Sequence, residues 1–481
     1  MKLKGLSNRL YSIFFDTHTV AGITISAILF IIFYAGAFSL FRHEISQWEN
    51  PSLRGMEATE LAVAPTLAAL HEAEPDFIET SRLTIRPGHS PYPEGMVYGE
   101  RTVTDSTTAF FQASVLVDAD GNYTITPREE NPVTIGNTLY QLHYLGQIPY
   151  IGLYLAGLTA LFFLFASVTG VLIHWRNIVT KFYAFSTRPS WKQIWTNAHT
   201  VLGMIGLPFQ VLYAITGAFY GILILLLIPS ALILFGGDTQ KVQAAVRPSA
   251  VMTFSDSAAV VDFSKSDLLI AQTKARLPDL RLRNIRFQNY GREDGILSLF
   301  FDDDKTMTGT AEVTYRVHTE EIIFESGPHK PDYVSSVLGT IGRLHFATYG
   351  GLGLKVIYFI LSMLTCFMLI SGVLLWQAAR DKRSYSDRER QFHHRVTKTN
   401  LAVCLGLIPA VALIFLLNKL IPMEISGRPG YVEGAFFLGW LLLVLVGLRW
   451  DNYRRMNRNY LICGGFFSLA IPLANDYITH T

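Results

Sequence analysis

The stretch His18-Thr-Val-Ala-Gly22 sets the plan of the chain, because it recurs almost unchanged as His199-Thr-Val-Leu-Gly203. Each copy stands at the start of an apolar run, and each histidine precedes a small-residue pair, Ala35-Gly36 or Thr216-Gly217, by the same spacing. An ionisable side chain in a membrane span is costly and usually functional. The repeat therefore predicts a duplicated membrane unit built around histidines.

Two later histidines obey the same duplication. His143 precedes Thr169-Gly170 by the spacing at which His345 precedes Ser371-Gly372. The chain up to Asp381 is thus predicted to hold two tandem copies of one unit, each consisting of a helix, a polar module and a second helix.

Composition indicates a membrane protein. The 481 residues are 50% hydrophobic and 16% charged, which is unusual for a water-soluble chain of this size. The net charge of +2 gives no indication of nucleic-acid binding. The cysteines lie in or beside apolar segments, so they are expected to be small buried hydrophobes rather than a disulfide framework or a metal site. They are Cys366, Cys404 and Cys463.

The expected fold class is a membrane all-α bundle of about seven transmembrane helices with two polar α+β modules. Apolar runs of spanning length predict the helices. They are Val20–Leu40, Tyr150–Ile173, Val201–Leu234, Val356–Trp376, Leu401–Ile421, Ala435–Leu448 and, more weakly, Tyr460–Leu473. The first run is too long for a signal peptide, so it is expected to be an uncleaved helix.

Positive charge predicts the orientation. Lys and Arg are concentrated before the first run and after the second, fourth and sixth. By the positive-inside rule, the N-terminus faces the cytoplasm and the C-terminus the periplasm, in a bacterial inner membrane. The charges after the runs are Arg176, Lys181, Arg188 and Lys192, then Arg380 to Lys398, then Arg449, Arg454, Arg455 and Arg458.

Six segments follow from this orientation. Each polar module is expected to begin with a helix, Leu61–Ala73 or Ser266–Ala275, and to continue in strands such as Ala113–Val117 and Ile296–Phe301, with Asp120-Gly121 as a hairpin turn. The segments are 1–41 with the first span, 42–140 as the first module, 141–235 with the second and third spans and a cytoplasmic loop, 236–339 as the second module, 340–380 with the fourth span, and 381–481 as an extension with three spans.

The histidines suggest iron porphyrin. Neutral imidazole is a good metal ligand, and a haem between two helices needs one imidazole on each face of its iron. The predicted orientation places His18 and His199 near the inner surface and His143 and His345 near the outer surface. The prediction is therefore two haem b groups at two depths. A hydrogen-bonded interfacial histidine without metal is the alternative for each one alone, but the duplicated register favours ligation.

Helical geometry adds two glycines to the site. His18 and Gly36 share a helix face about 27 Å apart, as do His199 and Gly217, so each helix could ligate one haem and offer a bare surface to the other. Between His143 and its glycine the same geometry gives opposite faces unless the helix breaks. Pro149 in one copy, and Gly350-Gly351 with Gly353 in the other, could break it.

Three further features carry open alternatives. His174 falls outside the repeat, and could replace His18 or His199 as a ligand, bind a haem propionate, or cap its helix. Arg343 could pair with a propionate or be an ordinary interfacial arginine. The run Asp302-Asp303-Asp304 could attract ferric ion, or be a solvated turn.

Jointly these motifs resemble the PepSY-associated transmembrane family of iron-regulated inner-membrane proteins, which includes ferric-siderophore reductases. The matching stretches are His18 to Gly22, Leu142-His143, Thr169 to His174, Asn197 to Gly203, Ile215-Thr-Gly217, Leu344 to Gly351 and Ser371 to Trp376. The resemblance implies a four-helix haem-binding core with PepSY-like periplasmic modules that moves electrons outward to ferric iron or a ferric siderophore. The chain departs from this pattern after Asp381, where three further helices follow.

The expected function is therefore that of a transmembrane ferric reductase in contact with membrane lipid. Its electron donor could be a quinol, a reduced flavin or a separate reductase. One alternative is a haem-free membrane anchor whose modules bind or regulate a periplasmic protease or sensor. Another is a component of iron-chelate transport, aided by the three last helices.

Overall fold

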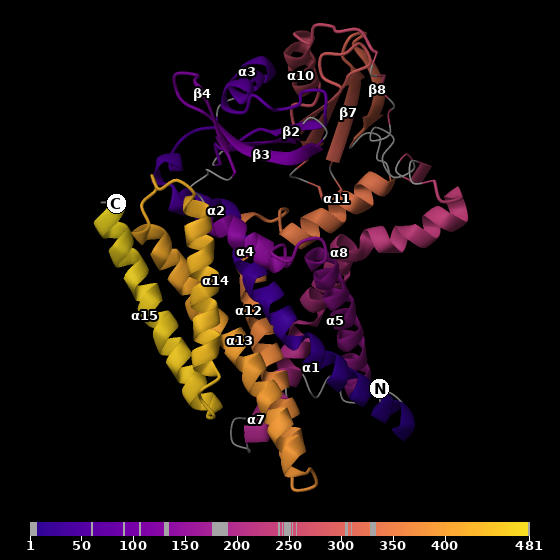
Figure 1. The fold of residues 1–481 in the computed structure, drawn as a ribbon. Helices are drawn as coiled ribbons and strands as arrows, with labels where there is room; N and C mark the ends of the chain where they lie inside the picture. Colours follow the sequence, from indigo (N-terminus) through magenta and orange to yellow (C-terminus); the bar gives the residue numbers. More distant parts are fainter. Residues whose placement is uncertain are drawn as a thin grey trace. The chain divides into compact units, whose positions relative to one another are not determined.

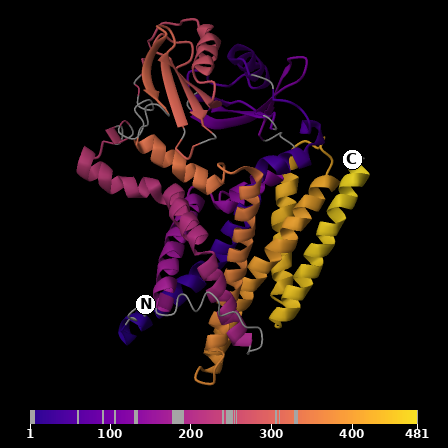
Figure 2. The ribbon, with the colours of Figure 1, turned by 180° about the vertical axis from the view of Figure 1, so that it is seen from behind.

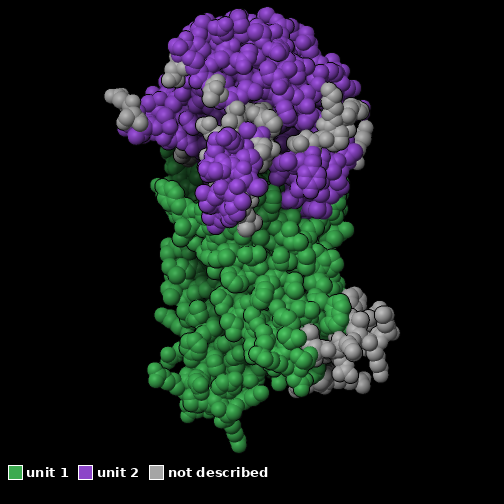
Figure 3. Space-filling model, turned by 90° about the vertical axis from the view of Figure 1, so that its right-hand side faces the viewer, with its two compact units in different colours: residues 1–49, 133–224, 345–481 green, residues 50–132, 225–344 purple. Residues whose placement is uncertain are grey.

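The chain folds into two compact units, coloured in Figure 3. The helical unit comprises Met1–Glu49, Val133–Ile224 and His345–Thr481, and the sheet unit comprises Asn50–Pro132 and Leu225–Leu344. This computed structural model describes residues 7–58, 61–89, 92–104, 107–128, 134–175, 191–238, 241–242, 244, 252, 254–255, 257–303, 306–308, 310–327 and 333–479.

Long apolar helices form the helical unit (Figure 1). Within the described residues, six helices are long and apolar enough to cross a membrane, or seven if the bent pair α7 and α8 counts as one span, which then equals the expected number. The short helices α2 (Arg42–Glu49) and α4 (Ile135–His143) also belong to this unit. The longer helices are α1 (Asn8–Ser39), α5 (Gly152–His174), α7 (Trp191–Ile205), α8 (Leu207–Phe235), of which the part after Ile224 belongs to the sheet unit, α12 (Gly351–Arg380), α13 (Asp387–Leu420), α14 (Arg428–Gly447) and α15 (Tyr453–Thr479).

The third span differs from its expected single stretch, Val201–Leu234. It is divided between α7 and α8, which meet at Gly206 with a bend of 68°. Pro208 explains the break, because proline lacks an N–H donor and its ring collides with the carbonyl of the preceding turn. The corresponding span of the first copy, α1, is continuous.

Both breaks expected after the second pair of histidines are present. The helix α4 ends at His143 and α5 begins at Gly152, while α11 (Tyr333–Phe346) ends one residue after His345 and α12 begins at Gly351. Leu145 and Ala347, each two residues beyond a histidine, have φ angles of 59° and 51°. Non-glycine residues seldom adopt this left-handed conformation, so the two copies share an unusual reversal.

One continuous eight-stranded antiparallel sheet forms the centre of the sheet unit, with four strands from each polar segment. The two segments join where β1 pairs with β5, so the two expected modules share a single sheet. The strands are β1 (Leu83–Arg86), β2 (Gly95–Thr104), β3 (Thr107–Val117), β4 (Tyr123–Pro127), β5 (Arg281–Gln288), β6 (Ile296–Asp302), β7 (Thr310–Arg316) and β8 (Glu321–Ser326), in the spatial order β4-β3-β2-β1-β5-β6-β7-β8.

Two helices cover one face of this sheet, α3 (Val63–Ala73) and α10 (Lys265–Arg276) (Figure 1, Figure 2). Their buried leucines pack with strand residues such as Phe287 and Leu299 in one apolar core. Both helices and the hairpin turn at Gly121, where φ is 84°, agree with the sequence expectation.

Of the three helices of the C-terminal extension, α13 lies in the interior of the helical unit and α15 lies at its surface. Within the apolar window of α13, 61% of the residues are buried, against 6% for α15. Leu407, Ala410 and Ile414 of α13 share a core with residues of α1 and α12. Cys366 and Cys404 are free and buried, as expected, and Cys463 is half-buried.

Candidate functional site

His18 and His199 form the first histidine pair. They lie on α1 and α7, both are half-buried, and their ring centres are 6.1 Å apart with the planes inclined at 70°. The Nδ1 atom of His18 is 2.8 Å from the carbonyl oxygen of Ala166 on α5. The Nδ1 atom of His199 is 3.0 Å from the carbonyl oxygen of Met368 on α12. Ala166 and Met368 occupy matching positions in the two copies.

His143 and His345 form the second histidine pair. They lie on α4 and α11, with ring centres 5.9 Å apart and planes inclined at 45°. The Nδ1 atom of His143 is 2.8 Å from the carbonyl oxygen of Ile32 on α1. The Nδ1 atom of His345 is 2.8 Å from Oγ1 of Thr216 on α8. The structure thus brings together the same two pairs that the sequence predicts.

These acceptors set the tautomer of all four rings. A backbone carbonyl can only accept a hydrogen bond, so His18, His143 and His199 carry their proton on Nδ1. The Thr216 hydroxyl donates its own hydrogen to the carbonyl oxygen of Leu212 at 2.8 Å, and therefore accepts from His345. Each ring is left with an Nε2 lone pair on its other side, which is the arrangement that second-shell acceptors give to metal-ligating histidines.

The ring separations fit a shared iron. A metal–imidazole bond is about 2.0 Å long and the nitrogen lies about 1.1 Å from the ring centre, so two rings on opposite faces of one metal are about 6.2 Å apart between centres. Stacked aromatic rings can lie at similar distances, and the tautomers therefore matter as much as the distances. Both pairs have the donor type, the free Nε2 and the separation that a bis-histidine haem needs.

Glycines make room for the imidazoles. A Cβ atom added at Gly36 would lie 2.5 Å from Nδ1 of His143, one at Gly372 would lie 2.9 Å from Cε1 of His199, and one at Gly170 would lie 3.2 Å from Cε1 of His18. From the sequence, Gly170 and Gly372 were used only to recognise the duplication. Their constant distance from a histidine was the signal that could have indicated a role in the site. At Gly217, a Cβ atom would instead meet Ala160 at 3.2 Å.

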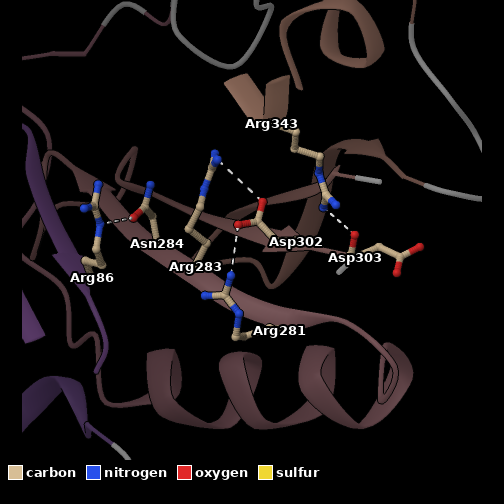
Figure 4. A network of polar contacts seen from close by, with 7 residues as sticks. All are labelled: Arg86, Arg281, Arg283, Asn284, Asp302, Asp303 and Arg343. Carbon is tan, nitrogen blue, oxygen red and sulfur yellow. Dashed lines mark hydrogen bonds and ion pairs between the residues drawn. The ribbon is translucent and has the colours of Figure 1, made fainter. Parts of the chain in front are cut away.

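The two remaining candidate residues are not members of the two ring pairs, although His174 lies close enough to His199 to interact with it electrostatically. His174 is the last residue of α5 and is half-buried. Arg343 is buried on α11, and its Nη2 donates to the carbonyl oxygen of Asp303 within the sheet unit (Figure 4). A role for either residue in binding haem or propionate stays a prediction.

The acidic run is engaged with arginines. Asp302 forms ion pairs with Arg281 at 3.4 Å and with Arg283 at 3.5 Å (Figure 4). Asp303 is buried, and Asp304 lies outside the described residues. This pairing favours a structural turn over a site that attracts ferric ion.

Fold and site together define a polytopic membrane protein whose helices gather four histidines into two pairs. The chain belongs to the PepSY-associated TM region family, whose model matches residues 15–379 and so includes all four histidines. An uncharacterized protein of Pseudomonas aeruginosa is 22% identical over 351 residues, which cover 70% of this chain and 86% of that protein. The helices α13, α14 and α15 lie beyond the matched range.

Proposed function

We propose that this chain is a di-haem electron-transfer protein of the bacterial inner membrane that reduces ferric iron or a ferric siderophore in the periplasm. One observation carries the proposal. Two histidine pairs, each with ring centres about 6 Å apart, hold their Nδ1 protons in hydrogen bonds and keep Nε2 available. Isolated interfacial histidines would have no need of this duplicated arrangement.

The spacing along α1 supports transfer across the bilayer. His18 lies on this helix, and Ile32, which accepts from His143, lies 14 residues further on. At 1.5 Å per residue the two levels are about 21 Å apart. This distance covers most of a hydrocarbon core about 30 Å thick.

Aromatic side chains fill the helical unit between the two levels. Phe33, next to Ile32, contacts Phe163 edge to face at 5.6 Å between ring centres, and Phe163 is one turn from Ala166. The Phe33 ring also contacts Tyr213, whose hydroxyl donates to the carbonyl oxygen of His345 at 2.8 Å. Such close packing leaves little room for water and holds in place the helices that position the two histidine pairs.

Haem, when bound, would supply one-electron chemistry between Fe(III) and Fe(II). The residues of this chain fix the imidazoles, set their tautomers and exclude solvent. One electron from a quinol, a reduced flavin or a separate reductase would enter on the cytoplasmic side and convert one ferric ion to ferrous ion outside. Basic residues such as Arg449 and Arg454 after α14 support the predicted orientation.

Spectroscopy of single-histidine variants tests this proposal. The purified wild-type protein should contain two haem b groups with a reduced low-spin spectrum. His345→Ala or His143→Ala should remove one haem, and His18→Ala or His199→Ala should remove the other. His43→Ala is the matched control, because His43 is exposed on α2, and should retain both.

Two outcomes would contradict the proposal. One is a colourless wild-type preparation after expression with ample haem. The other is an unchanged spectrum in both His143→Ala and His345→Ala. A colourless protein that binds a periplasmic protein stoichiometrically would instead support a haem-free membrane anchor.

A further inference from the structure

The helices beyond the family match make specific polar contacts with the helix that carries His143. Both α13 and α14 pack against α4. At that contact lies the carboxylate of Glu49, the last residue of α2, whose side chain is 1% exposed. A buried carboxylate is costly unless hydrogen bonds and positive charges compensate it, so its partners indicate what it does.

Glu49 caps the first turn of α4. Its Oε1 atom accepts from the backbone N–H of Thr134 at 2.9 Å, and both its oxygens accept from the N–H of Ile135, at 3.1 and 3.0 Å. Thr134 is the N-cap residue, and its own side chain makes no capping hydrogen bond. A carboxylate from another helix thus satisfies the orphan donors and the positive end of the helix dipole.

The extension holds this carboxylate in place. On α13, Asn418 Nδ2 donates to Glu49 Oε1 at 2.6 Å, and Lys419 Nζ donates to the carbonyl oxygen of Trp48 at 2.9 Å. Arg428 of α14 is 1% exposed and donates to the carbonyl oxygen of Asn418 at 2.5 Å. Asn418 therefore contacts the carboxylate that caps α4 directly, while Lys419 and Arg428 bind backbone carbonyls next to Glu49 and Asn418.

A second contact ties α14 to α4 directly. The hydroxyl of Thr138, fully buried on α4, lies 3.0 Å from Oε1 of Glu433 on α14 and 3.0 Å from the carbonyl oxygen of Thr134, so the two acceptors share its one hydrogen. Since α4 has only nine residues, it is too short to be stable on its own helical propensity. Its position must come from its tertiary contacts.

We infer that the C-terminal helices brace α4 through Glu49, and that Glu49, Asn418 and Arg428 are positioning residues for the imidazole of His143. These three residues hold the first turn of α4 in place, and His143 is the last residue of the same helix. The consequence for haem rests on the proposed function, whereas the bracing of α4 does not. The inference also gives the extension, which the family match does not include, a role in the second histidine pair.

Hydrogen exchange in the full-length protein, reconstituted in lipid nanodiscs, tests the brace without reference to haem. Losing one partner of a buried hydrogen bond to a charged group weakens local structure, so Asn418→Ala should speed amide exchange in residues 135–143 by about tenfold. Glu49→Gln should also speed exchange, because it removes the negative charge at the positive end of α4 and replaces one of the two oxygens that accept from Ile135 with an NH2 donor.

Asn400→Ala is the matched control. Asn400 is buried on the same helix, and its Nδ2 donates to Oγ of Ser26 on α1 at 2.7 Å. This variant removes a buried asparagine hydrogen bond of the same helix that does not involve α4, and exchange in residues 135–143 should match the wild type.

Two results would overturn the inference. One is an amide exchange rate in α4 of Asn418→Ala that equals the wild-type rate, and the other is the same acceleration of α4 exchange in Asn400→Ala as in Asn418→Ala. In haem-loaded protein, Asn418→Ala should also alter the spectrum of the haem at the second pair only. If the wild type proves colourless, the proposed function fails, while accelerated α4 exchange would still establish the brace.

Discussion

Replacing Gly36 with alanine tests the second histidine pair at its tightest contact. The new Cβ atom would lie 2.5 Å from Nδ1 and 2.8 Å from Cε1 of His143, where ordinary contact begins near 3.4 Å. The new Cβ atom is fixed to the backbone of α1 and cannot move away. The imidazole ring of His143 must therefore retreat by about 0.9 Å. The same movement would strain the hydrogen bond from Nδ1 of His143 to the carbonyl oxygen of Ile32, which lies on the same helix as Gly36.

A displacement of this size is large for a metal site. Overpacking a well-packed site costs roughly 1–3 kcal/mol, which corresponds to a loss of roughly 5- to 150-fold in haem affinity at the second pair. The first pair should be unaffected, because its rings contact other glycines.

The assay is haem content per chain, together with reductive titration of the purified variant. Gly22→Ala is the matched control, since Gly22 lies on the same helix and a Cβ there meets nothing within 4 Å. We expect one tightly bound haem in Gly36→Ala and two in Gly22→Ala. Two haems with wild-type spectra and potentials in Gly36→Ala would refute the assignment of His143 as a ligand held against α1.

Two further predictions concern a hydroxyl and a carboxylate. Thr216→Val keeps the side-chain shape but leaves Nδ1–H of His345 without its acceptor, so haem affinity at the second pair should fall about 10- to 100-fold; unchanged loading in a haem titration would contradict this. In the β3–β4 turn, hydrogen bonds from the side chain and the backbone N–H of Asn122 hold the pKa of Asp118 below its ordinary value. The stabilisation is therefore present above the unfolded-state pKa of about 3.9 and is lost as pH falls through the folded value. An NMR titration should show this low pKa, and an ordinary value would contradict it.

Much of the site was predictable because it depends on spacing. The duplicated distances from histidine to glycine gave both histidine pairs, and Pro149 and Gly350-Gly351 gave the breaks that let α4 and α11 end beside a histidine. Gly36 was predicted as a bare surface for haem, whereas its nearest neighbour is the His143 ring. That haem-facing role stays a prediction.

The acceptors of the Nδ1 protons were beyond sequence analysis. Three of the four are backbone carbonyls, at Ala166, Met368 and Ile32, and every residue has a carbonyl, so no side-chain pattern marks them. The fourth, Thr216, stands where the first copy has Ala35. Only the packing of α8 against α11 shows that this substitution supplies a hydrogen-bond acceptor.

The sequence by itself determined the number of apolar spans, the duplication and the identity of the four histidines, because hydropathy and spacing are local properties of a chain in lipid. Tertiary structure alone decided that the two polar segments share one sheet across β1 and β5, and that Glu49 meets Asn418, 369 residues away, at the cap of α4. Such pairings depend on which surfaces remain unsatisfied once the helices pack. A buried carboxylate and the first N–H groups of a short helix satisfy each other only when the fold brings them together.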